Sequence, residues 1–558
     1  MEGEIELKRK SSWWLLVVLC IIFVVSGCTT GKTTDGTSDP KGSANESPTD
    51  PGKEAAQRKV LILNNGDEPT SFDPPIAFDE VSYNILNNLM EGLTRLGADH
   101  TPHPAMAKDW KLSEDGRVYT FYLREDAKWS NGEPVTAHDF EYAWKRIADP
   151  EVASTAAFLT YNIEGAEAFN NGEGTRDEMQ VKALDATTLE VKLRQPQGYF
   201  LHIASMPVFF PVHQATAEAN ADWHKNAVTF VSNGPFKLKE WVHEEKMIAE
   251  KNEHYWDVAN VKLDEVVWHM ISDGDTEYQM YQAGQLHTSG VPGDLADQLA
   301  TSAELVIAPQ SGTYFYRFNL TMEPFQNQKI RQAFSMAIDR EQITKFIVKG
   351  GVEPAYGFVS TGFLDSEGQD FRQTNGALIK FDPAEAKRLL EEGMKEEGYT
   401  TLPPVTLTYN TSDAHKQIAE AMQQMIKEHL GIEMKLENTE WKVHLAAQKA
   451  LELQFNRSSF LADYADPINY LEGYRGGDSM NRTGWSNATY DQLLNEILAA
   501  TDEKQRFELM YQAEKILMEE SPILPLYFYN RNLLQKPEVT GIVRHPVGYL
   551  ELKWADLP

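Results

Sequence analysis

Thiol chemistry is confined to the first thirty residues of this 558-residue chain, where Cys20 and Cys28 are its only cysteines. A cysteine thiolate can act as a nucleophile, a metal ligand or a disulfide partner. Because no cysteine follows Cys28, we expect the folded body to contain no structural disulfide, no Cys-ligated metal and no cysteine nucleophile.

The other residues that commonly perform chemistry are not arranged in catalytic motifs. The chain contains neither His-Glu-x-x-His nor Gly-x-Ser-x-Gly, the spacings typical of zinc proteases and serine hydrolases. Its 14 histidines are scattered and form no ligand cluster. The sequence therefore predicts a protein that is not an enzyme and that carries no metal and no cofactor.

The sequence around Cys28 is typical of an exported lipoprotein. Lys8, Arg9 and Lys10 precede an apolar run at 13–25, which is short for a permanent membrane-spanning helix. The following Val-Ser-Gly-Cys at 25–28 resembles the bacterial lipobox, in which cleavage before the cysteine accompanies lipidation of its sulfur. We expect 1–27 to be a lipoprotein signal peptide, and 28–57 to be the lipidated Cys28 with a polar, flexible tether. An uncleaved signal anchor is the alternative.

Composition separates this chain from several function classes. The formal net charge of −31 argues against a nucleic-acid surface, which needs clustered Lys and Arg. The hydrophobic content of 42% and aromatic content of 11% are ample for packed interiors, and the length predicts two or three domains. The acidic balance indicates a solvated surface, or attraction of cationic ligands.

Strand-like and helix-like segments alternate after residue 58. The clearest βαβ unit combines a strand at 405–409, an amphipathic helix at 414–429 that ends at Gly431, and a strand at 432–436. Asp382 has the spacing of a helix N-cap. We also expect helices at 83–91 and 327–338, and strands at 59–63, 118–123, 189–193, 236–241, 247–251, 314–320, 526–529 and 551–554, the last two as a pair. The pattern favours an α/β protein with two lobes and a β-rich addition.

Several motifs in this body resemble one protein family in their order along the chain. They are EPTSFDP at 68–74, EGL at 91–93, KWSNGEPVTAHDF at 128–140, WKR at 144–146, NGPF at 233–236, KN and YW at 251–256, RQAF and AIDR at 331–340, and ADYADP at 462–467. Together they are similar to the family-5 bacterial extracellular solute-binding proteins, with most similarity to the oligopeptide-binding members. The resemblance covers essentially all of the chain after residue 58.

This resemblance implies a two-lobe, periplasmic-binding-protein-like fold of the cluster C type with an additional β-rich subdomain. Lobe I would comprise 58–94, 233–320 and 530–558, its additional subdomain 95–232, and lobe II 321–529. Ligand binding would close the two lobes by a hinge near 314–320 and 526–530, where the chain passes between them.

The resemblance also implies a set of ligand-binding residues. Asp463 matches the aspartate that pairs with a peptide's amine, and Arg457 matches an arginine that meets the peptide's carboxylate. Ser459 and Leu461 lie between them on a predicted strand whose backbone would pair with the peptide. Aromatic walls are expected from Trp441, Phe460 and Tyr529. Each position has a structural alternative: a capping aspartate, a salt bridge within the lobe, or plain core packing.

Two positions depart from the pattern of the oligopeptide-binding members. Phe460 stands at a pocket tryptophan of relatives, and Gln448 stands where a relative carries a basic residue. These differences leave peptide length and the mode of carboxylate capture open.

The function expected from the resemblance is capture of short peptides outside the cell and their delivery to the permease of an ABC importer. The protein would be a monomer, held by its lipid on the outer face of the membrane, or in the periplasm if the cell has an outer membrane. A receptor for one signalling or cell-wall peptide, a nickel-chelate or haem-binding relative, and an unrecognised hydrolase are the alternatives.

Overall fold

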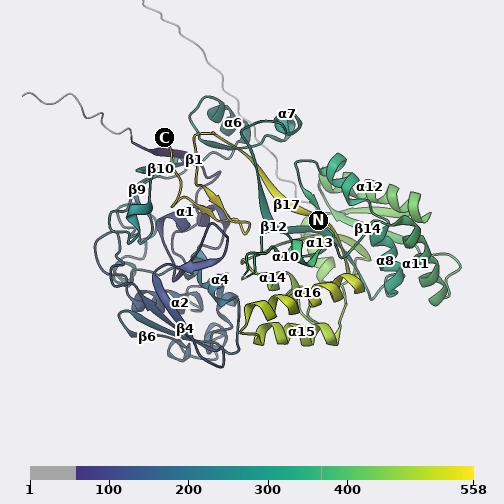
Figure 1. Ribbon diagram of the computed structural model, residues 1–558, viewed down its shortest axis with the longest axis horizontal. Coiled ribbons are helices and arrows are strands. Elements are labelled where there is room, and N and C mark those ends of the chain that lie inside the picture. The colour runs from purple at the N-terminus through teal and green to yellow at the C-terminus, as the bar shows by residue number, and fades with distance from the viewer. Residues whose placement is uncertain (1–57, 366) are drawn as a thin grey trace, which may run out of the picture. The chain divides into compact units, whose positions relative to one another are not determined.

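The computed structural model describes residues 58–365 and 367–558 (Figure 1). The predicted signal peptide at 1–27, Cys28 and the tether up to residue 57 lie outside the described residues. The fold is mixed α/β, and its strands form two larger sheets, a four-stranded antiparallel sheet and two small ribbons.

The first sheet contains the beginning of the described chain. Its strand order is β1-β10-β9-β8, from β1 (Val60–Asn64), β10 (Glu265–His269), β9 (Lys246–Lys251) and β8 (Phe236–Val242). β1 pairs with β10 in parallel, and β8 and β9 form the predicted hairpin. Helix α1 (Glu80–Leu89) follows β1 and begins at Asp79, whose side chain accepts from the amide of Ser82. The predicted strand and hairpin are confirmed, and the predicted helix begins three residues earlier because of this cap.

The β-rich addition is a four-stranded antiparallel sheet. It is built from β4 (Ala107–Leu112), β5 (Val118–Leu123), β7 (Thr188–Lys192) and β6 (Val181–Asp185), in that order. β5 alternates between buried and half-buried residues, as its sequence VYTFYL predicts. Helix α2 (Ala137–Ile147) packs on β6 and β7 and begins at Thr136 with a capping box.

The second large sheet has the order β11-β17-β12-β16-β14-β15, with β13 (Glu353–Pro354) beside β17. Its βαβ unit consists of β14 (Val405–Asn410), α12 (Asp413–Leu430) and β15 (Met434–Thr439), and the two strands are parallel. Gly431 ends α12 with a φ of 72°, a left-handed conformation that glycine adopts without strain. Asp382 caps α11 (Pro383–Glu396) by accepting from the amide of Glu385. The predicted βαβ unit and both caps are confirmed.

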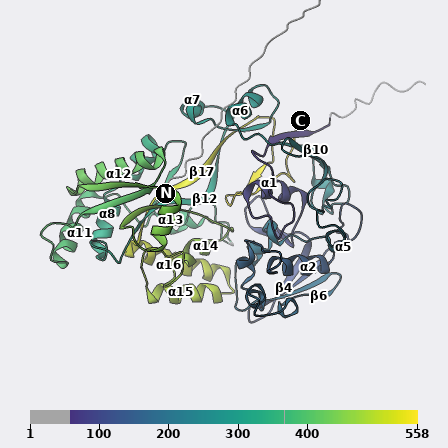
Figure 2. The same cartoon turned by 180° about the vertical axis from the view of Figure 1, so that it is seen from behind.

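Two long strands connect the parts of this sheet. β12 (Leu305–Phe318) and β17 (Ile523–Gln535) pair antiparallel, and their register shifts between Pro309 and Thr313. On one side of this break β17 pairs with β11 (Thr288–Gly290), and on the other side β12 pairs with β16 (Phe455–Leu461). Figures 1 and 2 show both strands extending from the region of α6 (Gly274–Gln282) toward α13 (Trp441–Lys449).

One expectation about the end of the chain is wrong. The segments at 526–529 and 551–554 do not pair with each other, because β12 occupies one edge of β17 while β11 and β13 occupy the other. The last strand is β19 (Leu550–Glu551), which is shorter than predicted and pairs with β18 (Val543–Arg544).

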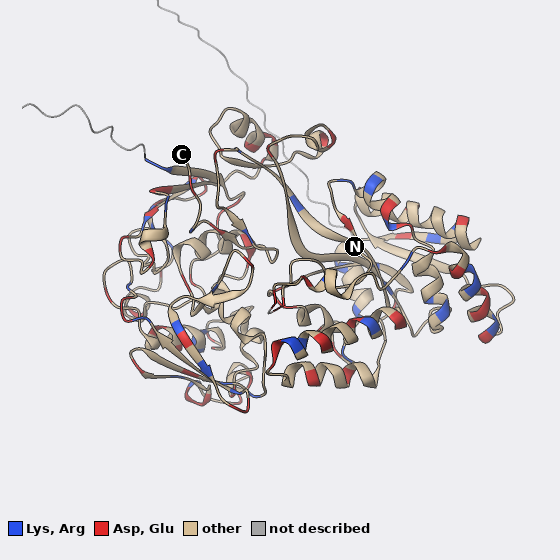
Figure 3. Cartoon of the chain, in the orientation of Figure 1, with Lys and Arg blue, Asp and Glu red and all other residues tan. Residues whose placement is uncertain are grey.

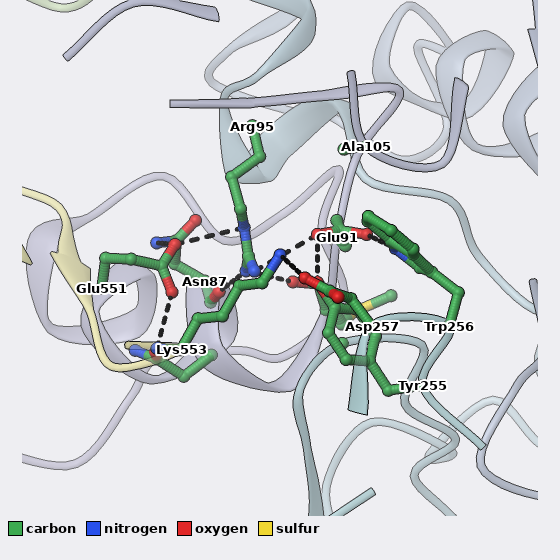
Figure 4. Close-up of polar contacts among 12 residues, drawn as sticks. Asn87, Glu91, Arg95, Ala105, Tyr255, Trp256, Asp257, Glu551 and Lys553 are labelled. Atoms are coloured by element: carbon green, nitrogen blue, oxygen red, sulfur yellow. Dashed lines mark hydrogen bonds and ion pairs between the residues drawn. The ribbon is translucent and has the colours of Figure 1, made fainter. Parts of the chain in front are cut away.

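The motifs that carry the family resemblance contact one another in a buried network (Figure 4). Glu91 accepts from Tyr255 Oη and from Trp256 Nε1, both at 2.6 Å. Arg95 lies within salt-bridge distance of both Glu91, at 3.2 Å, and Glu551, at 3.1 Å. The network therefore fastens the C-terminal segment to α1 and to the turn after β9.

A second pair of motifs meets in a buried ion pair. Arg146 donates from both terminal nitrogens to the two carboxylate oxygens of Asp73, each at 2.7 Å. Asn233 hydrogen-bonds both the amide and the carbonyl of Glu91. These contacts explain the motifs as scaffold, because their polar groups are used within the protein.

Charged residues outside these networks are mixed in sign on the helices. Acidic and basic side chains alternate along α11 and α16 (Glu503–Glu520) (Figure 3). On α11, Arg388 pairs with Glu385 at 2.6 Å. This arrangement agrees with a solvated acidic surface.

Candidate ligand-binding site

Strand β16 offers an open edge to a ligand. It pairs with β12 along all seven of its residues, from Gly312–Leu461 to Phe318–Phe455, but with β14 only at Phe455 and Asn456. Ala462 donates its amide to Ser311. Because an antiparallel ladder alternates, the amides and carbonyls of residues 457, 459 and 461 point away from β12, toward the open edge.

Two of these three residues keep their backbone groups available. The carbonyl of Arg457 accepts from His444 Nε2 at 3.0 Å and from Gln448 Nε2 at 2.7 Å. No residue of the described chain donates a side chain to the carbonyls of Ser459 and Leu461, and both residues are exposed. The prediction that this stretch is a strand is confirmed, and its backbone can pair with an extended peptide.

The side chains of Leu461 and Tyr529, two of the predicted site residues, both lie against Gly312. A Cβ placed on Gly312 of β12 would lie 2.4 Å from Leu461 Cδ2 and 2.8 Å from Tyr529 Cδ2. The same Cβ would also lie 2.9 Å from the carbonyl oxygen of Phe460, a backbone atom that cannot move aside, so the close approach of β12 and β16 at this point favours glycine. Leu461 is 53% exposed, so an apolar surface remains beside the open edge.

Arg457 is buried and has no acidic partner. Its Nη2 donates to Tyr529 Oη at 3.3 Å and its Nη1 to Asn410 Oδ1 at 3.4 Å, while the guanidinium lies 4.7 Å from the ring centre of Tyr314. Within residues 58–365 and 367–558, Arg457 forms no salt bridge with a carboxylate, and its Nε has no hydrogen-bond partner. The alternative of a salt bridge inside the lobe is thus not observed, and the charge is available to a ligand.

Two histidines that sequence reasoning missed lie beside Arg457. His415 Nδ1 is 3.2 Å from Tyr314 Oη, and burial together with the nearby Arg457 charge lowers the pKa of His415 to about 4. His444 is fully buried, and its ring lies parallel to that of Trp441. Trp441 itself is 46% exposed, so it leaves an aromatic surface open to solvent beside His444.

Asp463 follows the end of β16 and has an unpaired carboxylate. Its amide donates to Asn469 Oδ1 at 2.7 Å, and its carbonyl accepts from Tyr549 Oη at 3.4 Å, but no described residue hydrogen-bonds its side chain. The carboxylate keeps contact with solvent, yet the protein around it displaces enough water to raise its pKa above the ordinary value. A carboxylate in this state is stabilised by an incoming cation.

Asp463 lies where two cavities meet. A cavity of about 200 Å³ is bounded by Asp463, Leu461, Tyr83 and Tyr549, and a cavity of about 540 Å³ by Asp463 and Phe460. The next acidic residue, Asp466, is occupied, because Arg506 donates to both of its oxygens at 2.6 and 2.9 Å. Asp463 is therefore the acid of this motif that can receive a ligand.

Gln448 and Phe460, the two positions that depart from the oligopeptide-binding pattern, are uncharged and make contacts within the protein. Gln448 is buried and donates to Asn456 Oδ1 at 2.7 Å, in addition to the carbonyl of Arg457. Phe460 packs on Tyr470, with ring centres 4.6 Å apart. Gln448 thus supports β16 and does not add charge to the site.

The structure places all of the predicted peptide-binding residues on β16 or next to it, and the predicted lipidation site, Cys28, lies outside the described residues. Phe460, Leu461 and Asp463 line the two cavities, and Arg457 and Ser459 lie farther along β16. Trp441 is on α13, and Tyr529 is on β17. Their roles in ligand binding remain predictions. In the part of the chain that the structure describes, no three His, Cys, Asp or Glu side chains are grouped as metal ligands. No helix in that part is long and apolar enough to cross a membrane.

Comparison with known proteins identifies the family to which this chain belongs. The sequence model of the bacterial extracellular solute-binding proteins, family 5, matches residues 101–482 in its middle region. The chain belongs to this family. A solute-binding role of the family agrees with the open edge of β16 and with the two charges beside it that have no partner of opposite charge in the described part of the chain.

The chain is similar to individual family-5 proteins over nearly its whole length. It is 53% identical to the dipeptide-binding protein DppE of Bacillus subtilis (strain 168), over 98% of this chain and 99% of that protein. Its structure is similar to the unliganded open form of the periplasmic murein tripeptide binding protein MppA, with a TM-score of 0.82 and 33% identity over 90% of this chain and 98% of MppA. Similarity to Listeria monocytogenes OppA bound to peptide has a TM-score of 0.66 and 31% identity, over 90% and 99% of the two chains. The two-lobe fold is thereby confirmed.

Proposed function

We propose that this protein captures short peptides outside the cell and delivers them to the permease of an ABC importer. The observation that carries the proposal is a pair of unpartnered charges, Asp463 and Arg457, at the two ends of the open edge of β16. A peptide has a cationic amine, an anionic carboxylate and a ladder of amides between them. This one strand offers a partner for each of those shared groups.

The same geometry explains how many sequences can be bound. The amine would pair with Asp463, the carboxylate with Arg457, and the peptide backbone with Ser459 and Leu461. Side chains of the peptide would then enter the cavities lined by Phe460 and by Leu461. None of these contacts reads a side chain chemically, so affinity would rest mainly on the shared groups.

Two further features support closure of the lobes around the peptide. The higher TM-score is to an unliganded open form, and the lower one is to a peptide-bound relative. β12 and β17 stay paired on both sides of two register shifts, one between Pro309 and Thr313 and one between Tyr314 and Phe315. The hinge would lie near 314–320 and 526–530, at the second of these shifts, because a break in a ladder can bend more easily than a continuous one. We place the lobe boundaries as the family resemblance implies: 58–94, 233–320 and 530–558 in lobe I, 95–232 in its additional subdomain, and 321–529 in lobe II.

The remaining parts of the proposal concern location and activity. Cys28 would carry the lipid that holds the protein on the outer face of the membrane, and residues 29–57 would give the body reach. We propose a monomer that performs no catalysis. The absence of catalysis is supported by the family, whose members are solute-binding proteins.

A second candidate function uses the same site for one dedicated peptide. The similarity to a protein named for murein tripeptide binding favours a receptor for a cell-wall peptide as this second function. Native mass spectrometry of the purified, lipid-free chain separates the two functions. Many short-peptide masses on the protein are expected for general uptake, and one repeated mass would favour the receptor. If ligand-stripped protein binds no di-, tri- or tetrapeptide in calorimetry, the peptide function is wrong.

A further inference from the structure

A second buried arginine without an acid lies on the opposite face of β16 from Arg457. Arg317 is on β12, where it pairs with Asn456, and its side chain is 5% exposed. Strand alternation puts Arg317 beside Ser458, so it faces away from Arg457. It lines the 540 Å³ cavity that Asp463 and Phe460 also line.

The hydrogen bonds of Arg317 leave part of its guanidinium unused. Nε donates to Ser458 Oγ at 3.1 Å, and Nη1 donates to the carbonyl of Met480 at 3.1 Å. Nη2 has no partner among the described residues. No described carboxylate forms a salt bridge with Arg317, and burial lowers the pKa of Arg317, with a further lowering by the like-charged Arg482.

Other buried arginines of this protein show how unusual this is. Arg506 and Arg372 pair with the carboxylates of Asp466 and Glu514, each at 2.6 Å. Arg340, which also lacks an acid, uses all three of its nitrogens on Pro525, Ser335 and Ile338. Arg317 lacks an acid and uses only two of its three nitrogens, and its other neighbours are the rings of Phe315 and Tyr474, whose centres lie 5.0 and 5.7 Å from the guanidinium carbon. This is so although acids outnumber bases, 83 to 52, in this chain. A buried charge left in this state is costly unless a ligand completes it.

We infer that Arg317 is an anion subsite, which binds the carboxylate of an acidic side chain on the bound peptide. The inference rests on the proposed peptide function and adds a preference to it. The peptide's own terminus would go to Arg457 on the other face of β16, so the two arginines would bind two different carboxylates. A guanidinium is suited to this because it offers a planar pair of donors to a carboxylate.

Calorimetry on ligand-stripped protein tests the inference with matched tripeptides. The series carries Glu or Gln in turn at each position of an otherwise all-alanine peptide. At one position, the Glu peptide should bind the unchanged protein roughly 10- to 100-fold more tightly than its Gln partner. Arg317→Gln should reduce this ratio to about 1, and Arg317→Lys should keep part of it.

A control variant at another arginine of the same cavity distinguishes a specific anion subsite from the overall positive electrostatic potential of the cavity. Arg475 lines the same cavity but is held by Asn495 Oδ1 at 3.0 Å, so Arg475→Gln should leave the Glu preference intact. Melting without ligand provides a second readout. Arg317→Gln should not lower the melting temperature, because it removes an uncompensated buried charge, whereas a purely structural arginine would lower it.

The outcomes distinguish a failure of the anion subsite from a failure of the proposed peptide-binding function. If the peptides bind but show no Glu preference, or if Arg317→Gln keeps the preference, the subsite is wrong while peptide binding stands. If inorganic phosphate alone binds the unchanged protein and Arg317→Gln abolishes that binding, the subsite serves a free anion and the inference is overturned. If no peptide of the series binds, the proposed function itself fails.

Discussion

Arg457 donates from Nη2 to Tyr529 Oη at 3.3 Å, across the strand that separates them. Arg457 is on β16 and Tyr529 on β17, and β12 lies between these two strands in the sheet. The ring of Tyr314 on β12 packs against the guanidinium. The direction of the arginine is therefore set by three strands, although no acid fixes it.

This arrangement predicts a role for Arg457 that depends on the peptide's terminus. Arg457→Gln should weaken the binding of peptides with a free carboxylate roughly 10- to 100-fold. It should hardly change the binding of C-terminally amidated peptides. Calorimetry with both forms of one peptide measures the difference. Tyr529→Phe is the control, because it keeps the ring and removes one hydrogen bond, so its effect should be smaller. Equal losses for the acid and the amide would place the carboxylate elsewhere.

The raised pKa of Asp463 predicts how stability without ligand changes with pH. Because the folded-state pKa is above the unfolded-state value, the contribution of this group is fully present below the unfolded pKa, near 4, and is lost as pH rises through the folded pKa. At pH 7 the ligand-free Asp463→Asn protein should therefore melt no lower than the unchanged protein. The difference between the two should vanish at pH 3 to 4. A lower melting temperature for the variant at pH 7 would mean that the carboxylate has an internal partner.

Asp466, three residues later, predicts the opposite outcome. Asp466 and Arg506 are both almost fully buried and form a two-bond ion pair. Asp466→Asn leaves the Arg506 charge uncompensated and should lower the free energy of unfolding by about 3–5 kcal/mol. Urea denaturation of this variant beside Asp463→Asn makes the comparison. Similar stability of the two would contradict the division between a structural and a ligand-binding aspartate.

Lobe closure predicts a smaller particle with peptide. Small-angle scattering of the ligand-stripped protein should show a lower radius of gyration when saturating peptide is added. Asp463→Asn at the same peptide concentration should stay expanded, because its site is not filled. An unchanged radius with the unaltered protein fully bound would contradict closure of the two lobes.

The lipid anchor predicts a difference between the two cysteines. Cys28→Ser should remove the acceptor for the lipid and move the protein from the membrane fraction to the soluble fraction. Cys20→Ser, inside the apolar run, should leave the protein on the membrane. Fractionation of cells that express each variant makes the test, and membrane retention of a cleaved Cys28→Ser product would contradict lipidation.

Local patterns could be predicted from the sequence, and distant contacts could not. The βαβ unit, the cap at Asp382 and the strand through Ser459 depend on neighbouring residues, so spacing alone was enough. His415 meets Tyr314 across 101 residues of sequence, and only the pairing of β12 with β16 brings Arg317 beside Ser458. No local sequence signal marks His415 or Arg317. The position of His415 depends on a distant contact, and Arg317 is distinguished by having no acidic partner among the described residues of the folded protein. The wrong pairing of 526–529 with 551–554 has the same origin, since strand neighbours are chosen by the whole sheet.

The central claim is that Asp463 receives the amine of a bound peptide. An ammonium group enclosed by closed lobes has lost its water and needs a charged partner, and removing one member of such a pair costs about 3–5 kcal/mol. Calorimetry with ligand-stripped Asp463→Asn should show free-amine peptides bound roughly a hundredfold to several thousandfold more weakly than by the unchanged protein. N-acetylated peptides should bind the unchanged protein poorly and lose little more on mutation. Unchanged affinity of Asp463→Asn for free-amine peptides would contradict the account.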